Sequence, residues 1–192
     1  YDTGWKGKGL KIKEILPGGV LSLADSDIKA GDMIESIEGV TPDMSGDWMS
    51  FIAAKAGKRI CTTVTKQGSG QAEEMFVVPS GSESRQLYRR WVKQREDMVE
   101  KLSNGRIGYV HIEGMDSDSF REMFSKALGK YRTCQALKVD TRNNGGGSLH
   151  DYEVTFLGGK LYTKYITRGQ FIGDEPFTKW KKPSSLLIVE DK

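Results

Sequence analysis

The residues with the clearest chemical potential in this chain form a glycine-rich stretch. Positions 140–147 read Asp-Thr-Arg-Asn-Asn-Gly-Gly-Gly and lie between an apolar segment and a segment with helical spacing. Glycines carry no Cβ, so the backbone N–H groups of such a loop can approach a ligand closely. A helix start adds unpaired N–H donors and the positive end of the helix dipole. The loop therefore suits an anion, which could be a phosphate, a carboxylate or the oxyanion of a tetrahedral intermediate.

Two alternatives to an oxyanion site stay open for this loop. A nucleotide-binding α/β protein would need a phosphate motif, but the sequence contains neither G-x-x-x-x-G-K-S/T nor G-x-G-x-x-G. That alternative rests on the glycines alone. The other alternative is a glycine turn with a purely structural purpose.

The histidines and serines give little sign of a nucleophile or base. His111 lies in an alternating apolar segment, where a core or rim histidine is more frequent than a catalyst. His150 follows the glycines at the start of the expected helix, so it is a candidate for contact with substrate. The serines at 80–84, 117–119 and 184–185 stand outside any G-x-S-x-G motif and are typical of turns and caps.

The composition excludes several classes of protein. Of 192 residues, 29 are basic and 26 acidic, and these charges are interleaved, which argues against a nucleic-acid binder. No apolar run approaches the roughly 20 residues of a membrane span. Cys61 and Cys134 lie far apart without a second ligand pair, so we expect small buried side chains in strands of different domains. We predict no metal and no cofactor.

The first 80 residues show the pattern of short strands with one helix. Apolar and charged residues alternate at 10–15 and 33–37, which predicts strands. Trp48, Phe51 and Ile52 recur at helical spacing and predict a helix at 48–55. Two further strands are expected at 59–65 and 74–78. The pattern predicts a small barrel-like α+β domain over residues 1–80.

Beyond this domain the pattern changes to strands that alternate with helices. Pro-Ser-Gly-Ser at 79–82 marks the boundary, and an amphipathic helix without Gly or Pro at 83–102 forms a connector over 81–104. Residues 105–192 then predict an α/β domain with a parallel sheet. Its strands are expected at 107–112, 136–139 and 185–189, and its helices at 117–129 and 149–157.

The last expected strand carries a prediction of its own. Leu-Leu-Ile-Val at 186–189 is apolar without alternation, which is typical of a strand covered on both faces inside a parallel sheet. Such a strand needs a further neighbour, and the sequence stops three residues later. We therefore expect the sequence to be cut rather than complete.

Several blocks of sequence resemble one peptidase family. Tyr-Arg-Arg-Trp-Val at 88–92, Gly-Arg-Ile-Gly-Tyr-Val-His-Ile at 105–112 and positions 139–147 resemble the tricorn-core branch of the C-terminal-processing-peptidase family of serine proteases. The blocks at 7–12 and 28–39 resemble the PDZ domain that this family carries before its catalytic core. The resemblance implies an α+β PDZ-like small barrel, followed by a truncated α/β catalytic-core segment of the ββα, crotonase/ClpP-like type.

The resemblance also implies roles for the glycine loop. Gly145, Gly146 and Gly147 would form the oxyanion hole, with Gly147 as the favoured N–H donor. The nucleophilic serine would follow the strand at 186–189, and the base would lie before the PDZ domain or after that serine. Both would then stand outside this chain, so the chain alone is predicted to be inactive.

In the PDZ-like part, Gly9, Leu10, Lys11 and Ile12 would form a loop that holds a peptide's terminal carboxylate. The peptide would add as a strand beside 10–15, with the helix at 48–55 as the other wall. Lys11 stands where PDZ loops commonly carry a small residue.

The implied partner is a peptide or unfolded polypeptide, and the full-length protein is expected to form homo-oligomers. The alternatives are a non-catalytic peptide-binding scaffold or a spacer domain, and the compartment, cytoplasm or periplasm, stays open.

Overall fold

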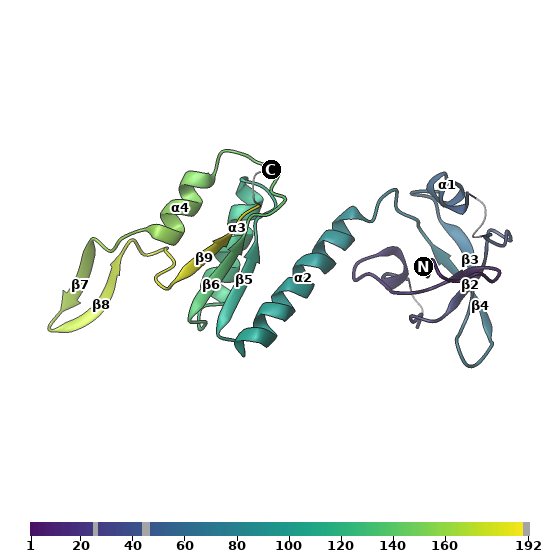
Figure 1. The fold of residues 1–192 in the computed structure, drawn as a ribbon, viewed down its shortest axis with the longest axis horizontal. Coiled ribbons are helices and arrows are strands. Elements are labelled where there is room, and N and C mark those ends of the chain that lie inside the picture. The colour runs from purple at the N-terminus through teal and green to yellow at the C-terminus, as the bar shows by residue number, and fades with distance from the viewer. Residues whose placement is uncertain (25–26, 44–46, 190–192) are drawn as a thin grey trace. The chain divides into compact units, whose positions relative to one another are not determined.

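The computed structural model describes residues 1–24, 27–43 and 47–189. The chain divides into two compact units, Tyr1–Trp91 and Val92–Lys192, and the boundary falls inside helix α2 (Ser84–Ser103) (Figure 1). Each unit combines helices with small sheets, which confirms the mixed α/β class. The three domain ranges and the two named fold types stay predictions.

The first unit is built on one antiparallel sheet with the strand order β1-β2-β3-β4. Alternation at 10–15 predicted a longer first strand than the structure contains. Gly31 (φ 101°) turns the chain just before β2, so only Ile12 still pairs with that turn, and residues 13–15 have no partner on β2. The strands are β1 (Leu10–Lys11), β2 (Met33–Ile37), β3 (Ile60–Thr65) and β4 (Ala72–Val77).

Helix α1 (Trp48–Ala53) covers the core of this sheet. The side chain of Asp47 caps it by accepting a hydrogen bond from the N–H of Ser50 at 3.1 Å. Trp48, Phe51 and Ile52, whose spacing predicted the helix, pack against the buried residues of the sheet. A short 3₁₀ helix, η1 (Val20–Ser22), precedes β2. The core consists of Leu10, Ile12, Ile28, Ile37, Ile60, Val64, Met75 and Val77.

The second unit contains a parallel three-stranded sheet, as the alternation of strands and helices predicted. Its strand order is β5-β6-β9. Because both pairs are parallel, the chain must cross over between neighbouring strands, and each crossover contains a helix rather than a tight turn. Its core is formed by Val110, Ile112, Met123, Ala127, Tyr131, Leu137, Val139, Phe156 and Trp180. The elements are β5 (Ile107–His111), α3 (Ser117–Ser125), the π-helical turn η2 (Lys126–Lys130), β6 (Ala136–Asp140), α4 (His150–Gly158) and β9 (Ser184–Leu187).

A buried ion cluster fixes the π-helical turn. Glu96 on α2 is only 7% exposed, and its two carboxylate oxygens accept hydrogen bonds from Lys126 and Lys130, each at 2.8 Å. The lysines are four residues apart and reach one carboxylate together. The cluster therefore joins α2 to the end of α3 within the second unit.

The end of the second unit and one cysteine differ from what the sequence predicts. A hairpin of β7 (Thr163–Thr167) and β8 (Gln170–Glu175) was not predicted, and its turn has positive φ at Arg168 and Gly169. The predicted last strand is present as β9, which pairs with β6 in the described sheet, and Leu186 is 57% exposed there, so the described residues do not supply the cover that the sequence predicts and this cover stays a prediction. Cys134 lies in the turn before β6, not in a strand, whereas Cys61 lies in β3.

Candidate functional site

A buried carboxylate fixes the start of the glycine loop. Asp140, the last residue of β6, has no exposed surface, and the hydroxyl of Tyr109 on β5 donates to its Oδ2 at 2.7 Å. Arg142 donates to the same carboxylate from Nε (2.9 Å), from Nη2 (2.6 Å) and from its backbone N–H (3.0 Å). The side chain of Arg142 therefore folds back onto the strand end, which sets the direction in which the loop leaves the sheet.

Charge and burial act against each other at Asp140. Burial alone would raise the pKa of this carboxyl, but the hydrogen bonds from Arg142 and Tyr109 outweigh burial and lower the pKa to about 2. Burial, and next the Asp140 carboxylate, raise the pKa of Tyr109. Asp140 therefore stays ionised at neutral pH and serves as a fixed anchor.

The segment after β5 holds the glycine loop through backbone hydrogen bonds. The N–H of Gly145 donates to the carbonyl of Glu113 at 2.9 Å, and the carbonyl of Gly146 accepts from the N–H of Met115 at 2.8 Å. The carbonyl of Met115 in turn accepts from the N–H groups of Ser148 and Leu149, both at 3.1 Å. The loop is thus fixed on both sides of Gly147.

The side chain of Asn144 completes this support. Its amide nitrogen donates to the carbonyl of Ile112 at 2.9 Å, and its Oδ1 accepts from the N–H of Gly146 at 2.6 Å. The N–H groups of two of the three glycines are therefore used inside the protein.

Gly147 differs from the two glycines before it. Its φ is 137°, and a Cβ at this position would stand 2.3 Å from the carbonyl oxygen of Met115, so only glycine fits. The residue is exposed, and the described part of the chain offers no hydrogen-bond acceptor to its N–H. The loop thus holds one backbone donor in a fixed position and leaves it unused.

The two histidines occupy different surroundings. His111, on β5, is 8% exposed, and its Nε2 lies 2.8 Å from the carbonyl oxygen of Arg142, which places it under the loop. His150 is the first residue of α4, and its largely exposed ring lies 3.4 Å from the carboxylate of Asp151. His111 thus supports the loop from the sheet, while His150 stands in solvent at the helix start.

Sequence reasoning missed Glu153, on the first turn of α4. Its side chain is buried at 5% exposure, and its Oε1 has no hydrogen-bond partner within the described residues. Burial raises the pKa of Glu153 to about 7, with a smaller opposing effect of His150 and a small raising effect of Asp116. A signal was present, because Glu153 lies four residues after Leu149 and three before Phe156, on the apolar face of the helix.

The predicted carboxylate loop of the first unit has most of its groups engaged. The N–H of Gly9 donates to the carbonyl of Pro42 at 3.3 Å, and the N–H of Ile12 donates to the carbonyl of Asp32 at 2.9 Å. Leu10 and Lys11 pair with β2. Gly9 has a φ of 75°, and a Cβ there would stand 2.5 Å from the carbonyl oxygen of Ile34, so this position also requires glycine. The structure places these four residues side by side, but most of their backbone N–H groups already donate hydrogen bonds within the protein and are not left for a peptide carboxylate.

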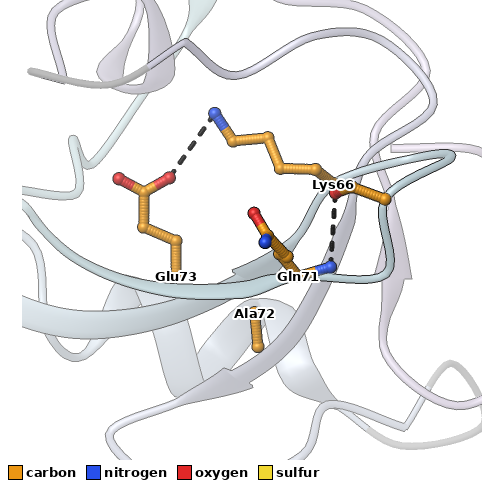
Figure 2. A pocket seen from close by; sticks show the side chains of 5 residues that line it. Lys66, Gln71, Ala72 and Glu73 are labelled. Carbon is orange, nitrogen blue, oxygen red and sulfur yellow. Dashed lines mark hydrogen bonds and ion pairs between the residues drawn. The ribbon is translucent and has the colours of Figure 1, made fainter.

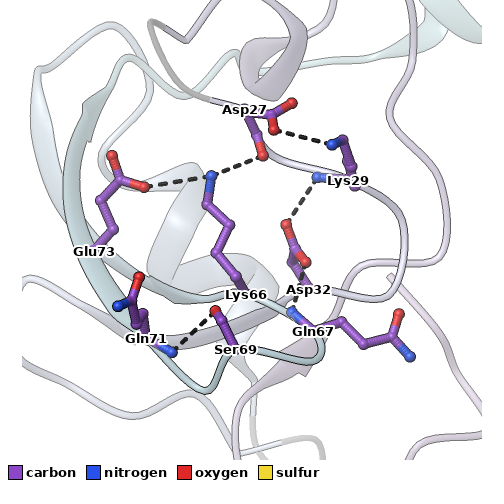
Figure 3. A network of polar contacts seen from close by, with 8 residues as sticks. All are labelled: Asp27, Lys29, Asp32, Lys66, Gln67, Ser69, Gln71 and Glu73. Atoms are coloured by element: carbon purple, nitrogen blue, oxygen red, sulfur yellow. Dashed lines mark hydrogen bonds and ion pairs between the residues drawn. The ribbon is translucent and has the colours of Figure 1, made fainter.

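A hollow at the β3–β4 turn is lined by groups that bond to one another (Figure 2). The Nζ of Lys66 lies 3.4 Å from Oε2 of Glu73 and donates to the carbonyl of Asp27 at 2.8 Å. Asp32 accepts from the N–H groups of Lys29 (2.8 Å) and Gln67 (2.9 Å), which joins the turn before β2 to the turn after β3 (Figure 3). This network stabilises two turns and offers no reactive group.

The ranges that the structure describes contain neither a cluster of metal ligands nor a membrane-spanning helix. No three His, Cys, Asp or Glu side chains there are arranged to hold a metal ion. None of the helices in these ranges is long and apolar enough to cross a bilayer.

Comparison with known proteins identifies relatives of both units. Residues 106–190 match peptidase family S41. The chain is 29% identical over 142 residues to tricorn protease homolog 1 of Streptomyces coelicolor, which covers 74% of this chain and 13% of that protein. It is 28% identical over 147 residues to the tricorn protease of Thermoplasma volcanium, which covers 77% of this chain and 14% of that protein. The chain thus spans about one seventh of the length of these relatives.

A solved structure supports the same relationship at the level of the fold. The crystal structure of the tricorn protease superposes with a TM-score of 0.65 at 24% identity, over 83% of this chain and 15% of that one. These matches confirm the resemblance to the tricorn branch of the processing peptidases.

Proposed function

Because residues 106–190 carry the peptidase family S41 match and most of the chain resembles tricorn proteases, we propose that it is a segment of a tricorn-like serine endopeptidase. Its substrates are peptides or unfolded chains. The observation that carries the proposal is the N–H of the exposed Gly147, which has no acceptor within the described residues and lies in a loop that is fixed on both sides. An oxyanion hole needs such a donor before the reaction begins.

In the proposed mechanism, Gly147 donates its N–H to the oxygen of the scissile carbonyl. Negative charge gathers on that oxygen in the tetrahedral intermediate, and a donor already in place stabilises it without rearrangement. Gly145 and Gly146 use their own N–H groups to hold the loop, so they position Gly147 rather than bind the oxyanion. His150, at the exposed start of α4, lies on the same segment and is a candidate for contact with the peptide.

Neither histidine is assigned the role of base in this proposal. Nε2 of His111 lies against the carbonyl of Arg142, and His150 lies beside Asp151 in solvent. The nucleophile and the base come from residues outside this chain, and residues 1–192 alone do not cleave peptide bonds. The PDZ-like unit engages or gates the substrate at the outer edge of β1.

The loop assignment is tested by two glycine substitutions in the full-length gene product. Gly147→Ala places a Cβ against the carbonyl of Met115 and moves the N–H, so kcat on a fluorogenic peptide should fall by about 100-fold or more. Gly145→Ala is the matched control, because its nearest non-local atom would be the carbonyl oxygen of Glu113 at 3.8 Å. Its kcat should stay within about threefold of the parent enzyme. Equal rates in both variants would remove Gly147 from the mechanism.

The source of the nucleophile is tested separately with a fluorophosphonate probe that labels activated serines. The full-length product should be labelled on a serine outside residues 1–192, and the isolated chain should stay unlabelled. Labelling of a serine within this chain would contradict the proposal. Peptide binding without labelling or hydrolysis would favour the alternative, a non-catalytic peptide-binding scaffold.

A further inference from the structure

The outer edge of β1 is the place where the proposed function expects a peptide to add. The backbone N–H of Ile12 and the carbonyl of Ile12 both bond to the turn before β2, at 2.9 and 2.8 Å. Successive residues of a strand direct their backbone groups to opposite sides, so the carbonyl of Lys11 faces the outer edge. A strand added there would use this carbonyl first.

That carbonyl already has a partner. The N–H of Asp2 donates to the carbonyl oxygen of Lys11 at 2.8 Å, so the beginning of the chain lies along the outer edge of β1. Asp2 itself is half-buried in this position. The contact is a single backbone bond of the kind that an added strand would make.

The neighbouring side chain reaches the predicted second wall. The ring of Tyr1 packs edge-on against the ring of Trp48 on α1, with centroids 4.4 Å apart and an interplanar angle of 89°. The hydroxyl of Tyr1 also lies 3.5 Å from the sulfur of Met49. Residues 1 and 2 therefore contact both elements between which a peptide is expected, with an aromatic side chain on α1 and a backbone bond to β1.

Residues 3–8 return the chain from this position to the strand. The N–H groups of Gly4 and Trp5 donate to the side chain and carbonyl of Asp2, at 3.0 and 3.1 Å. The indole N–H of Trp5 donates to the carbonyl of Lys8 at 3.3 Å, and Nζ of Lys11 lies 5.4 Å from the Trp5 ring. The turn is thus closed by its own bonds and holds Tyr1 and Asp2 in place.

We propose that residues 1–5 are an intramolecular ligand that occupies the peptide-binding edge of β1 and must leave before a substrate peptide adds. This inference rests on the proposed function and concerns the regulation of that same site. Asp2 occupies the position from which an added strand would donate to the carbonyl of Lys11, so the tethered segment competes with any peptide at a high local concentration. The geometry also defines the ligand class, a peptide that places an aromatic ring on Trp48.

The test compares Tyr1→Ala with the full-length parent protein. The probe is a fluorescein-labelled peptide of sequence Tyr-Asp-Thr-Gly-Trp, which matches the proposed internal ligand, and its affinity is measured by fluorescence anisotropy. Loss of the edge-on ring contact weakens the internal ligand only, so the probe should bind about threefold to tenfold more tightly to the variant. Tyr162→Ala is the matched control, because it removes an exposed tyrosine from the second unit and should leave the affinity unchanged.

Hydrogen exchange gives a readout that needs no peptide. The Asp2 amide should be protected in the parent protein and should lose its protection in Tyr1→Ala. An unprotected Asp2 amide in the parent protein would overturn the inference whatever the probe does.

The binding outcomes separate the inference from the proposed function. Equal, measurable affinity in the parent and Tyr1→Ala would overturn the internal-ligand role and leave peptide binding at β1 intact. If neither the parent nor Tyr1→Ala bound the probe at millimolar concentration, peptide binding at the edge of β1 would be overturned. The role of residues 1–5 as an internal ligand would be overturned with it.

Discussion

The two glycine-containing loops that the sequence predicts to bind peptide groups differ in how many of their backbone groups are hydrogen-bonded within the protein. At 9–12, the N–H groups of Gly9 and Ile12 donate to neighbouring carbonyls, and the carbonyl of Lys11 accepts from Asp2. At 145–147, the loop is equally well held, yet the N–H of Gly147 has no acceptor in the described residues. Glycine in the sequence marks where backbone can approach a ligand, whereas the surrounding backbone decides whether a donor is left for it.

The loops also differ in what anchors them. The 145–147 loop leaves the sheet at the buried Asp140, which bonds to Tyr109 and Arg142, and helix α4 after the loop holds the buried Glu153, whose Oε1 has no hydrogen-bond partner among the described residues. The 9–12 loop depends on backbone bonds and on Asp32, which bonds to two other backbone N–H groups. Predictions at three side chains, Asp140, Glu153 and Asp32, test this difference, from the largest effect to the smallest.

Asp140→Ala should produce the largest loss of stability. It leaves Tyr109 and Arg142 without their shared acceptor, and we expect the free energy of unfolding to fall by about 3 kcal/mol, because Arg142 can partly reach water. The measurement is urea unfolding at pH 7 followed by circular dichroism. Tyr109→Phe removes only one hydrogen bond and should cost about 1 kcal/mol.

The pH dependence of the same anchor follows from its lowered pKa. The folded protein keeps Asp140 ionised to about pH 2, whereas the unfolded chain protonates it near pH 3.8. The stabilisation is therefore present above pH 3.8 and is lost as the pH falls through about 2. If Asp140→Ala unfolded with the parent's free energy at pH 7, the charged anchor would have no part in the difference between the loops.

Glu153 should make the second unit less stable as the pH rises. The unfolded chain ionises this carboxyl near pH 4.5, while the folded protein keeps it protonated to about pH 7. The contribution of Glu153 to the free energy of unfolding is therefore highest below pH 4.5. It declines up to about pH 7, by at most about 3 kcal/mol. The value of about 7 already includes His150, which lowers the pKa, and Asp116, which raises it slightly.

Glu153→Gln keeps the shape of the side chain and removes its titration. Its unfolding free energy, measured in urea between pH 4.5 and 7, should lose the decline that the parent shows. A parent protein whose stability is flat over this range would show that Glu153 reaches water, and the buried carboxyl would then no longer distinguish the surroundings of the two loops.

The sequence predicted the elements that carry each loop because their signals are local. Alternation at 33–37, helical spacing at Trp48, Phe51 and Ile52, and a run free of Gly and Pro at 83–102 all correspond to observed elements. The position of the 145–147 loop between a buried strand and a helix was predicted for the same reason. Its assignment as an oxyanion hole stays a prediction.

The features that the sequence did not predict depend on contacts between distant residues. The unused N–H of Gly147 follows from the bonds that Met115 makes on either side of it, and the contact of Tyr1 with Trp48 joins residues 47 positions apart. Leu186, in the apolar run of the last strand, is 57% exposed among the described residues, so the cover that the run predicts stays a prediction. The β7–β8 hairpin was missed because its apolar residues do not alternate and its turn is Arg168-Gly169 rather than a stronger turn pair.

Among Asp140, Glu153 and Asp32, the smallest effect on stability should come from Asp32, the anchor of the first loop. Asp32→Ala removes one acceptor from the N–H groups of Lys29 and Gln67, in turns that lie near solvent, so we expect a loss of about 2 kcal/mol (Figure 3). The Ile12 amide, which donates to the carbonyl of Asp32, should exchange faster with deuterium. Asp27→Ala is the control, since its exposed pair with Lys29 should leave the urea midpoint unchanged. If Asp32→Ala left the exchange of Ile12 unchanged, the backbone bonds alone would hold the 9–12 loop, and its closure would be independent of any charged side chain.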